Sequence, residues 1–152
     1  MMASKRRTAI VDAEAELATR LRLGVTRLAR RLRQQSVEGD VTASMLSALA
    51  TIEVRGSLTL GELAELERIR PPSMTRIVSR LEALGVVTRK ADSHDRRVFK
   101  VTLTPAGSRY VSSARKRKNA YLVKRLHALE PDELRKLDDA LEVIEKLVEG
   151  DR

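Results

Sequence analysis

The sequence predicts a mainly helical (α+β) fold in which one β-hairpin interrupts a series of helices. Along most of the 152 residues, apolar side chains recur every three or four positions, the spacing of one face of an α-helix. Two runs, "VVTRKA" at 86–91 and "RVFKVTL" at 97–103, are β-rich, and they flank the turn-forming "DSHDR". The length suits one domain with appendages.

The first two helices are predicted from their apolar periodicity and from a capping signal. A helix over 10–35 carries a regular apolar stripe of Leu17, Leu21, Val25, Leu28 and Leu32. The segment "SVEGD" ends it, and Thr42 is placed to cap a second helix. Val41 and Leu46 have the spacing of a hydrophobic staple across that cap.

Two shorter helices follow. Thr59 and Glu62 have the spacing of a capping box, and Leu58 and Leu63 occupy the two staple positions. This helix ends at "IRPP", where Pro71 suits the first turn of the next helix because its missing N–H is not needed there. That next helix extends through "PPSMTRIVSRLEAL" to a glycine cap at position 85.

The second strand and the last two helices complete the chain. Phe99, Val101 and Leu103 alternate with polar or smaller residues, which predicts one buried strand face. Thr104 and Pro105 begin a helix that reaches His127 or beyond. The last helix opens at "EPDEL" and carries a narrow stripe typical of a helix–helix seam, formed by Leu134, Leu137, Leu141, Ile144 and Val148.

A hairpin directly after a pair of short helices defines a winged helix-turn-helix, here expected over 40–104. The helices over 10–35 and 105–150 have apolar stripes that one small winged domain cannot cover, so they need each other and a second chain. We therefore expect a helical dimerisation region that includes Leu17, Leu21, Leu137, Leu141, Ile144 and Val148.

Positive charge is concentrated in the middle of the chain. The net charge is +9, and residues 55–118 alone hold fifteen Lys and Arg against six acids. This pattern favours a polyanionic partner, with nucleic acid ahead of an acidic membrane surface. Phe99, Tyr110 and Tyr121 are too few aromatic residues for a base-stacking platform, which favours double-stranded over single-stranded nucleic acid.

The helix over 71–84 separates into two faces. The face expected in the core holds Met74, Ile77, Val78, Leu81 and Leu84. The opposite face holds Pro72, Thr75, Arg76 and Ser79, with Ser73 and Arg80 on its flanks. Small residues, hydroxyls and arginine suit a major groove, and the first turn is expected to offer free amides to phosphates. An ordinary amphipathic helix remains the alternative.

The hairpin tip is the second candidate for DNA contact. Arg97 is placed to enter an adjacent minor groove, where narrow A·T-rich DNA concentrates negative potential. Asp95 is expected to hold the Arg97 guanidinium in an extended pose, whereas Arg96 is either a phosphate contact or simply solvated. In isolation, the tip also fits a solvated turn.

These segments together resemble the MarR family of winged helix-turn-helix transcription regulators. Its wing signature is Asp, one residue, Arg, and a strand ending in Leu-Thr, and "DSHDRRVFKVTLTPAG" is similar to it through Asp95, Arg97, Leu103 and Thr104. The segment "RPPSMTRIVSRLEALGVVTR" resembles the recognition helix and first wing strand, and the element order agrees from about 10 to 148. Ser93 departs from the family, which often has proline there.

The resemblance implies an obligate homodimer built from the first and last helices, which binds a pseudo-palindromic operator in double-stranded DNA, usually as a repressor. It also implies major-groove or phosphate contacts from Ser73, Thr75, Arg76 and Arg80, and a minor-groove contact from Arg97. Many members release DNA when a small, often phenolic or anionic, effector binds between the dimer helices and the winged domain. The sequence itself shows no such site.

Other classes of protein find little support. There is no glycine-rich phosphate loop and no nucleophile–base pairing, so we expect no enzyme and no cofactor. His94 and His127 lack partners at ligand spacing and there is no cysteine, which disfavours a metal site. No apolar run is long enough for a membrane span, so a cytoplasmic protein is expected. A sequence-independent architectural DNA-binding protein and a module for an acidic protein partner remain open alternatives.

Overall fold

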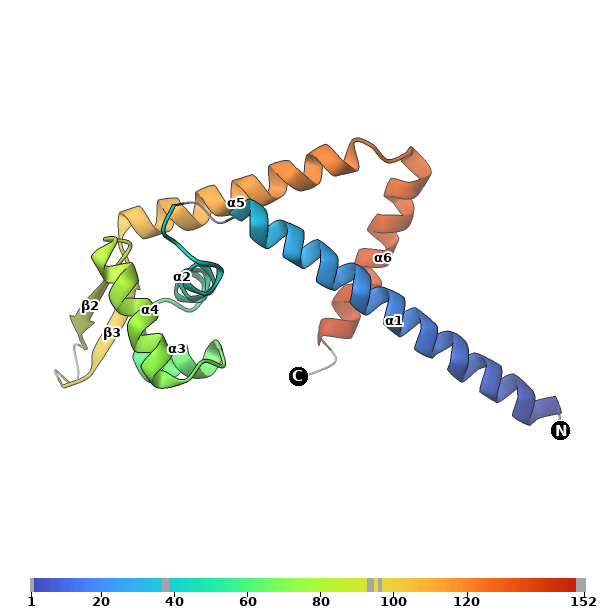
Figure 1. Ribbon diagram of the computed structural model, residues 1–152, viewed down its shortest axis with the longest axis horizontal. Coiled ribbons are helices and arrows are strands. Elements are labelled where there is room, and N and C mark those ends of the chain that lie inside the picture. Colours follow the sequence, from blue (N-terminus) through green and yellow to red (C-terminus); the bar gives the residue numbers. More distant parts are fainter. Residues whose placement is uncertain (1, 37–38, 93–94, 96, 150–152) are drawn as a thin grey trace.

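The computed structural model describes residues 2–36, 39–92, 95 and 97–149, and in the first helix it describes side chains from residue 12 onward. A small winged unit lies at one end of the molecule, and three long helices extend away from it (Figure 1). The elements in chain order are α1 (Met2–Ser36), α2 (Ala43–Arg55), β1 (Leu58–Thr59), α3 (Leu60–Leu66), α4 (Pro71–Ala83), β2 (Val87–Ala91), β3 (Phe99–Leu103), α5 (Pro105–Leu126) and α6 (Pro131–Glu149). The predicted mainly helical fold is confirmed, although α1 begins earlier than the expected residue 10.

The sheet has three strands in the order β1-β3-β2, all antiparallel, rather than the two that the sequence predicts. The additional strand, β1, pairs Leu58 with Val101 and Thr59 with Lys100. It is only two residues long, so no alternating pattern marks it in the sequence.

The predicted helix caps are present. The Thr42 side chain accepts from the Met45 amide at 3.3 Å, and Thr104 caps α5 in the same way. At α3 the Thr59 amide donates to Glu62 Oε2 at 2.8 Å, and the Glu62 amide donates to Thr59 Oγ1 at 3.2 Å. The hydrogen bond from the Thr59 amide lowers the pKa of Glu62, so this cap is complete above the usual carboxyl pKa and is lost as pH falls through the lowered value.

The core of the winged unit lies between α2, α3, α4 and the sheet, and it includes Met74, Val78, Leu81 and Val101, all fully buried. Two predicted core residues are exposed, Leu84 at 42% and Phe99 at 56%, whereas Ile77 and Leu103 are partly buried against the core. Leu84 is the C-cap of α4, directly before Gly85 turns the chain with a φ of 69°. Phe99 lies at the outer end of β3, two residues beyond the buried Val101.

Gly107 lets the start of α5 approach the turn between α4 and β2. A Cβ atom at this position would lie 2.0 Å from the backbone oxygen of Val86, so only glycine fits without movement. In the same region the Thr104 amide donates to Val86 O at 3.1 Å, and Thr104 Oγ1 donates to Gly85 O at 2.6 Å. These contacts join the long α5 closely to the winged unit.

Helix α5 also joins the winged unit to α1. Arg115 forms an ion pair with Glu53 of α2, and Arg117 Nη2 donates to the backbone oxygen of Ser36 at 3.0 Å. In the described parts of the chain, no helix is long and apolar enough to cross a membrane.

Candidate nucleic-acid interface

The outer face of α4 carries all six helix residues that the sequence predicts to face DNA. Met74, Val78 and Leu81 anchor the opposite face in the core and thereby fix the rotation of the helix. The exposed residues are Pro72, Ser73, Thr75, Arg76, Ser79 and Arg80. Within the described parts of the chain, the side chains of Arg76 and Arg80 make no hydrogen bond or ion pair. Their guanidinium groups are therefore available to an external acceptor.

The first turn of α4 does not offer the free amides expected from the sequence. Pro71 and Pro72 occupy its first two positions and have no N–H. The amides of Ser73 and Met74 both donate to the backbone oxygen of Arg70, at 2.9 and 3.1 Å. An anion at this end of α4 would therefore have to be contacted by side chains.

The two hydroxyls in the middle of α4 already have partners. Thr75 Oγ1 donates to the backbone oxygen of Pro71 at 3.0 Å, which leaves the hydroxyl as an acceptor and its methyl group free for apolar contact. Ser79 Oγ accepts from Arg89 Nη2 at 3.0 Å and can still donate one hydrogen bond. A thymine methyl or a base amino group therefore suits Thr75 better than a phosphate does.

Arg89 of β2 is a residue that the sequence reasoning missed. Besides its bond to Ser79, its Nε lies 3.3 Å from Glu82 Oε2, an ion-pair distance without the alignment of a hydrogen bond. The strand pairing places Arg89 opposite the buried Val101. In the sequence, Arg89 stands between Val87 and Ala91 on one strand face. A charged residue on a face that is otherwise apolar needs a partner, so this alternation could have identified Arg89. Arg89 connects the wing to α4.

The wing turn is held by its own acids. Lys100 Nζ lies 2.6 Å from Asp92 Oδ2, and this pairing raises the pKa of Lys100. Asp95 Oδ1 accepts from the backbone amide of Arg97 at 2.9 Å, and the Val98 amide donates to Asp95 O at 2.9 Å. Asp95 therefore shapes the backbone of the turn, and the expected contact with the Arg97 guanidinium is not formed.

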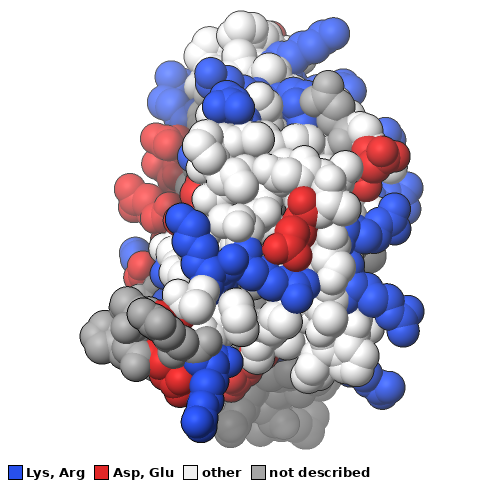
Figure 2. All heavy atoms as spheres, turned by 90° about the vertical axis from the view of Figure 1, so that its left-hand side faces the viewer, with Lys and Arg blue, Asp and Glu red and all other residues white. Residues whose placement is uncertain are grey.

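The side chain of Arg97 is exposed beside the turn, and among the described residues its guanidinium has no partner. Arg96, Ser93 and His94 lie outside the described residues. In the space-filling view of this end of the molecule, Lys and Arg side chains cross the middle of the face and line its right-hand edge, while acids gather mainly at the left-hand edge (Figure 2). This distribution suits a polyanion laid across the face.

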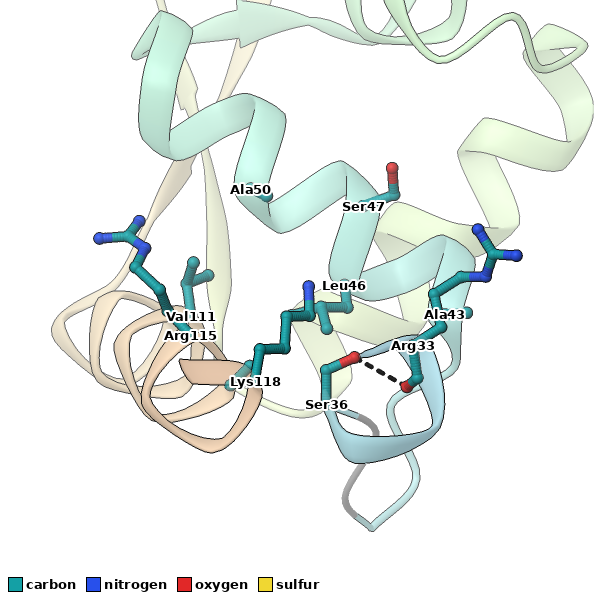
Figure 3. A pocket seen from close by; sticks show the side chains of 10 residues that line it. Arg33, Ser36, Ala43, Leu46, Ser47, Ala50, Val111, Arg115 and Lys118 are labelled. Carbon is teal, nitrogen blue, oxygen red and sulfur yellow. Dashed lines mark hydrogen bonds between the residues drawn. The ribbon is translucent and has the colours of Figure 1, made fainter. Parts of the chain in front are cut away.

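A pocket of about 280 Å³ lies where α1, α2 and α5 meet (Figure 3). Leu46, Ala50, Val111 and Ala114 form much of its apolar wall, and the remaining lining residues are Arg33, Ser36, Ala43, Ser47, Arg115 and Lys118. Figure 3 shows Lys118 extending from α5 toward α2, with Arg33 and Arg115 on either side. Sequence reasoning found no such site, because its residues come from three distant segments. Among the described residues, no three His, Asp or Glu side chains form a group that could hold a metal ion.

Comparison with known proteins gives a consistent result. Residues 41–99 match the model of the MarR family. An uncharacterised HTH-type transcriptional regulator of Mycobacterium leprae is 39% identical over 140 residues, which cover 92% of this chain and 98% of that protein. Among solved structures, a Pseudomonas aeruginosa protein described as a transcriptional regulator is 30% identical, with a TM-score of 0.80. The match covers 91% of this chain and 96% of the Pseudomonas chain. A MarR family protein of Bacillus stearothermophilus is 25% identical with a TM-score of 0.74, over 88% and 94% of the two chains.

Proposed function

Because the chain belongs to the MarR family of transcription regulators, which are not enzymes, we propose that it is a dimeric repressor of a pseudo-palindromic operator. The single observation that carries this proposal is the pair of arginines on the outer face of α4, Arg76 and Arg80, whose side chains have no partner among the described residues, beside a wing that presents Arg97. Such a dimer would act in the cytoplasm, where a protein bound to an operator blocks transcription.

Dimerisation is supported by the long helices. Leu17, Leu21, Leu137, Leu141 and Val148 are exposed in the single chain, and Ile144 is only half-buried. Residues 12–36 carry six arginines against three acids, whereas α6 carries three basic residues against seven acids. Apolar stripes and opposite charge both favour packing of these helices against a second copy. The dimerisation region would comprise 10–35 and 105–150, and the DNA-binding domain 40–104.

In such a dimer the two α4 helices would enter successive major grooves, roughly 34 Å apart. Arg76 has the reach to pair with both acceptors of a guanine, and Arg80 and Ser73 are placed on the flanks for phosphates. Arg97 extends from the wing toward the neighbouring minor groove. Because the first turn of α4 lacks free amides, side-chain cations supply most of the contact with phosphates.

The test begins with selection of bound genomic fragments to find the operator. Arg76→Ala and Arg97→Ala are then each expected to cost about 1–3 kcal/mol on that operator, with Arg76→Ala also relaxing base preference. Affinities on the operator and on random duplex would be measured by fluorescence anisotropy. Arg135→Ala on α6, which removes an exposed arginine already paired with Asp132, is the matched control.

The measured affinities distinguish a base contact from a phosphate contact at Arg76, and they distinguish the proposed function from its alternatives. Equal losses on operator and random DNA would reassign Arg76 to a phosphate contact. A wild-type protein with no preference for any operator would favour the architectural alternative, and failure to bind duplex at low salt would favour an acidic protein partner.

The pocket between α1, α2 and α5 suits a small anionic effector. Its volume of about 280 Å³ is at the lower end for ligand sites, which limits the ligand to about one ring. Arg115 is paired with Glu53, so Arg33 and Lys118 are the cations left for a carboxylate or phenolate. The pocket joins the helical region to α2, and a bound ligand can therefore change the position of the winged unit relative to the dimer.

Benzoate is a suitable probe for this effector site. We expect millimolar benzoate to weaken operator binding by the wild type and to have a much smaller effect on Lys118→Ala, because the variant lacks the central cation of the pocket. Anisotropy titrations with and without benzoate measure this. Lys136→Ala, on α6 outside the pocket, controls for loss of a lysine. Identical responses of wild type and Lys118→Ala would remove the pocket from the proposal.

A further inference from the structure

The wing has one apolar face near its tip. In the register of β2 and β3, Arg89 lies opposite Val101, and the next pair on the same face is Ala91 with Phe99. Val101 is fully buried under the helices, whereas Phe99 is 56% exposed. The apolar face of the sheet therefore continues beyond the core that covers it.

The opposite face of the same strand ends is charged, because Lys100 and Asp92 form their ion pair there. The apolar patch of Ala91 and Phe99 is on the side of the sheet from which Arg89 reaches Ser79 and Glu82 of α4. Arg89 is thus folded against α4 and does not cover Phe99. The patch therefore lies on the face of the sheet that is turned toward α4.

Helix α4 and the wing diverge from a shared turn. The Val86 amide donates to Leu81 O at 3.1 Å and holds the turn that joins α4 to β2. Each arm presents arginine: Arg76 on α4 and Arg97 at the wing. If both arms contact a duplex in neighbouring grooves, the sugar–phosphate chain that separates those grooves must pass between them, beside the sheet face that carries Phe99.

We propose that Phe99, supported by Ala91, packs against the deoxyribose rings of that DNA strand. The inference rests on the proposed function, since it requires duplex DNA on this face. Deoxyribose presents C–H groups between charged phosphates, so an exposed aromatic ring two residues from the exposed Arg97 matches it in both polarity and charge. The contact adds affinity without reading sequence.

Phe99→Ala tests the proposal. Val54→Ala is the matched control, because Val54 is a 79% exposed apolar residue on α2, which precedes the α3–α4 pair and the wing and carries none of the proposed DNA contacts. We expect Phe99→Ala to bind operator and random duplex about tenfold more weakly, as expected for lost burial of part of an aromatic side chain. The slope of log affinity against log salt should not change, because no phosphate contact is lost. Thermal unfolding should also match the wild type, because the ring is largely exposed.

Wild-type affinity retained by Phe99→Ala would overturn the inference while leaving the proposed function intact. A loss confined to the operator would also overturn it, because the ring would then contact or separate bases. If the wild type itself bound no duplex, the proposed function would fail first. Phe99→Leu, which keeps apolar bulk, is expected to recover most of the affinity.

Discussion

Operator binding should weaken by ~10³–10⁵-fold when salt is raised from about 50 to about 200 mM, if the dimer contacts ~6–10 phosphates. The physical reason is the release of counterions from DNA as lysine and arginine neutralise its phosphates. The chain carries a net charge of +9, and residues 55–118 hold fifteen basic residues against six acids. Since α4 lacks free amides in its first turn, these side chains must supply most phosphate contacts.

Anisotropy titrations at several salt concentrations would measure this effect. The slope of log affinity against log salt is expected to be about −0.9 for each phosphate contact. Loss of a phosphate-binding cation such as Arg80 should make this negative slope shallower by about one unit for each copy of the side chain. A nearly flat response would contradict an interface dominated by phosphates.

The double substitution Leu141→Glu with Ile144→Glu should convert the proposed dimer to monomers or to unfolded chain. Leu141 is 48% exposed and Ile144 half-buried in the single chain, and both belong to the apolar stripe of α6. In the proposed dimer this stripe is covered by the partner, and burying unpaired carboxylates there costs several kcal/mol. Sedimentation velocity would measure the mass, and circular dichroism would report whether the helices remain.

Lys146→Glu provides the matched control. It changes the net charge by the same two units as the double substitution but lies on the exposed polar face of α6. This variant should remain dimeric. If the double variant also stayed a stable dimer, the interface would lie elsewhere on the chain.

Local signals in the sequence were sufficient for most elements. The threonine caps at Thr42, Thr59 and Thr104 and the first-turn proline of α4 mark helix starts through short-range hydrogen bonding and sterics, so they could be read from neighbouring residues. The exposed face of α4 was also predicted correctly, because helical periodicity fixes which residues lie opposite the core.

Three expectations were wrong because they depended on distant contacts or on how far the core extends. Two more, the free amides in the first turn of α4 and the contact of Asp95 with the Arg97 guanidinium, were wrong for local reasons. Strand β1 exists through pairing of Leu58 and Thr59 with β3, and two residues carry no pattern of their own. Leu84 and Phe99 follow the apolar period but lie past the edge of the covering helices. Asp95 lies close enough to contact Arg97, yet its carboxylate bonds the backbone amide instead of the guanidinium.

The sequence by itself determined the order of helices and hairpin, the face of α4 presented to solvent and the concentration of positive charge, because periodicity, caps and charge are local properties. Only the tertiary structure decided that Arg89 is bound to Ser79 and Glu82, that Arg33 and Lys118 share a pocket, and that Phe99 is exposed at the edge of the core. Each of these depends on the packing of segments far apart in the chain, which brings together side chains whose separation in sequence gives no sign that they meet.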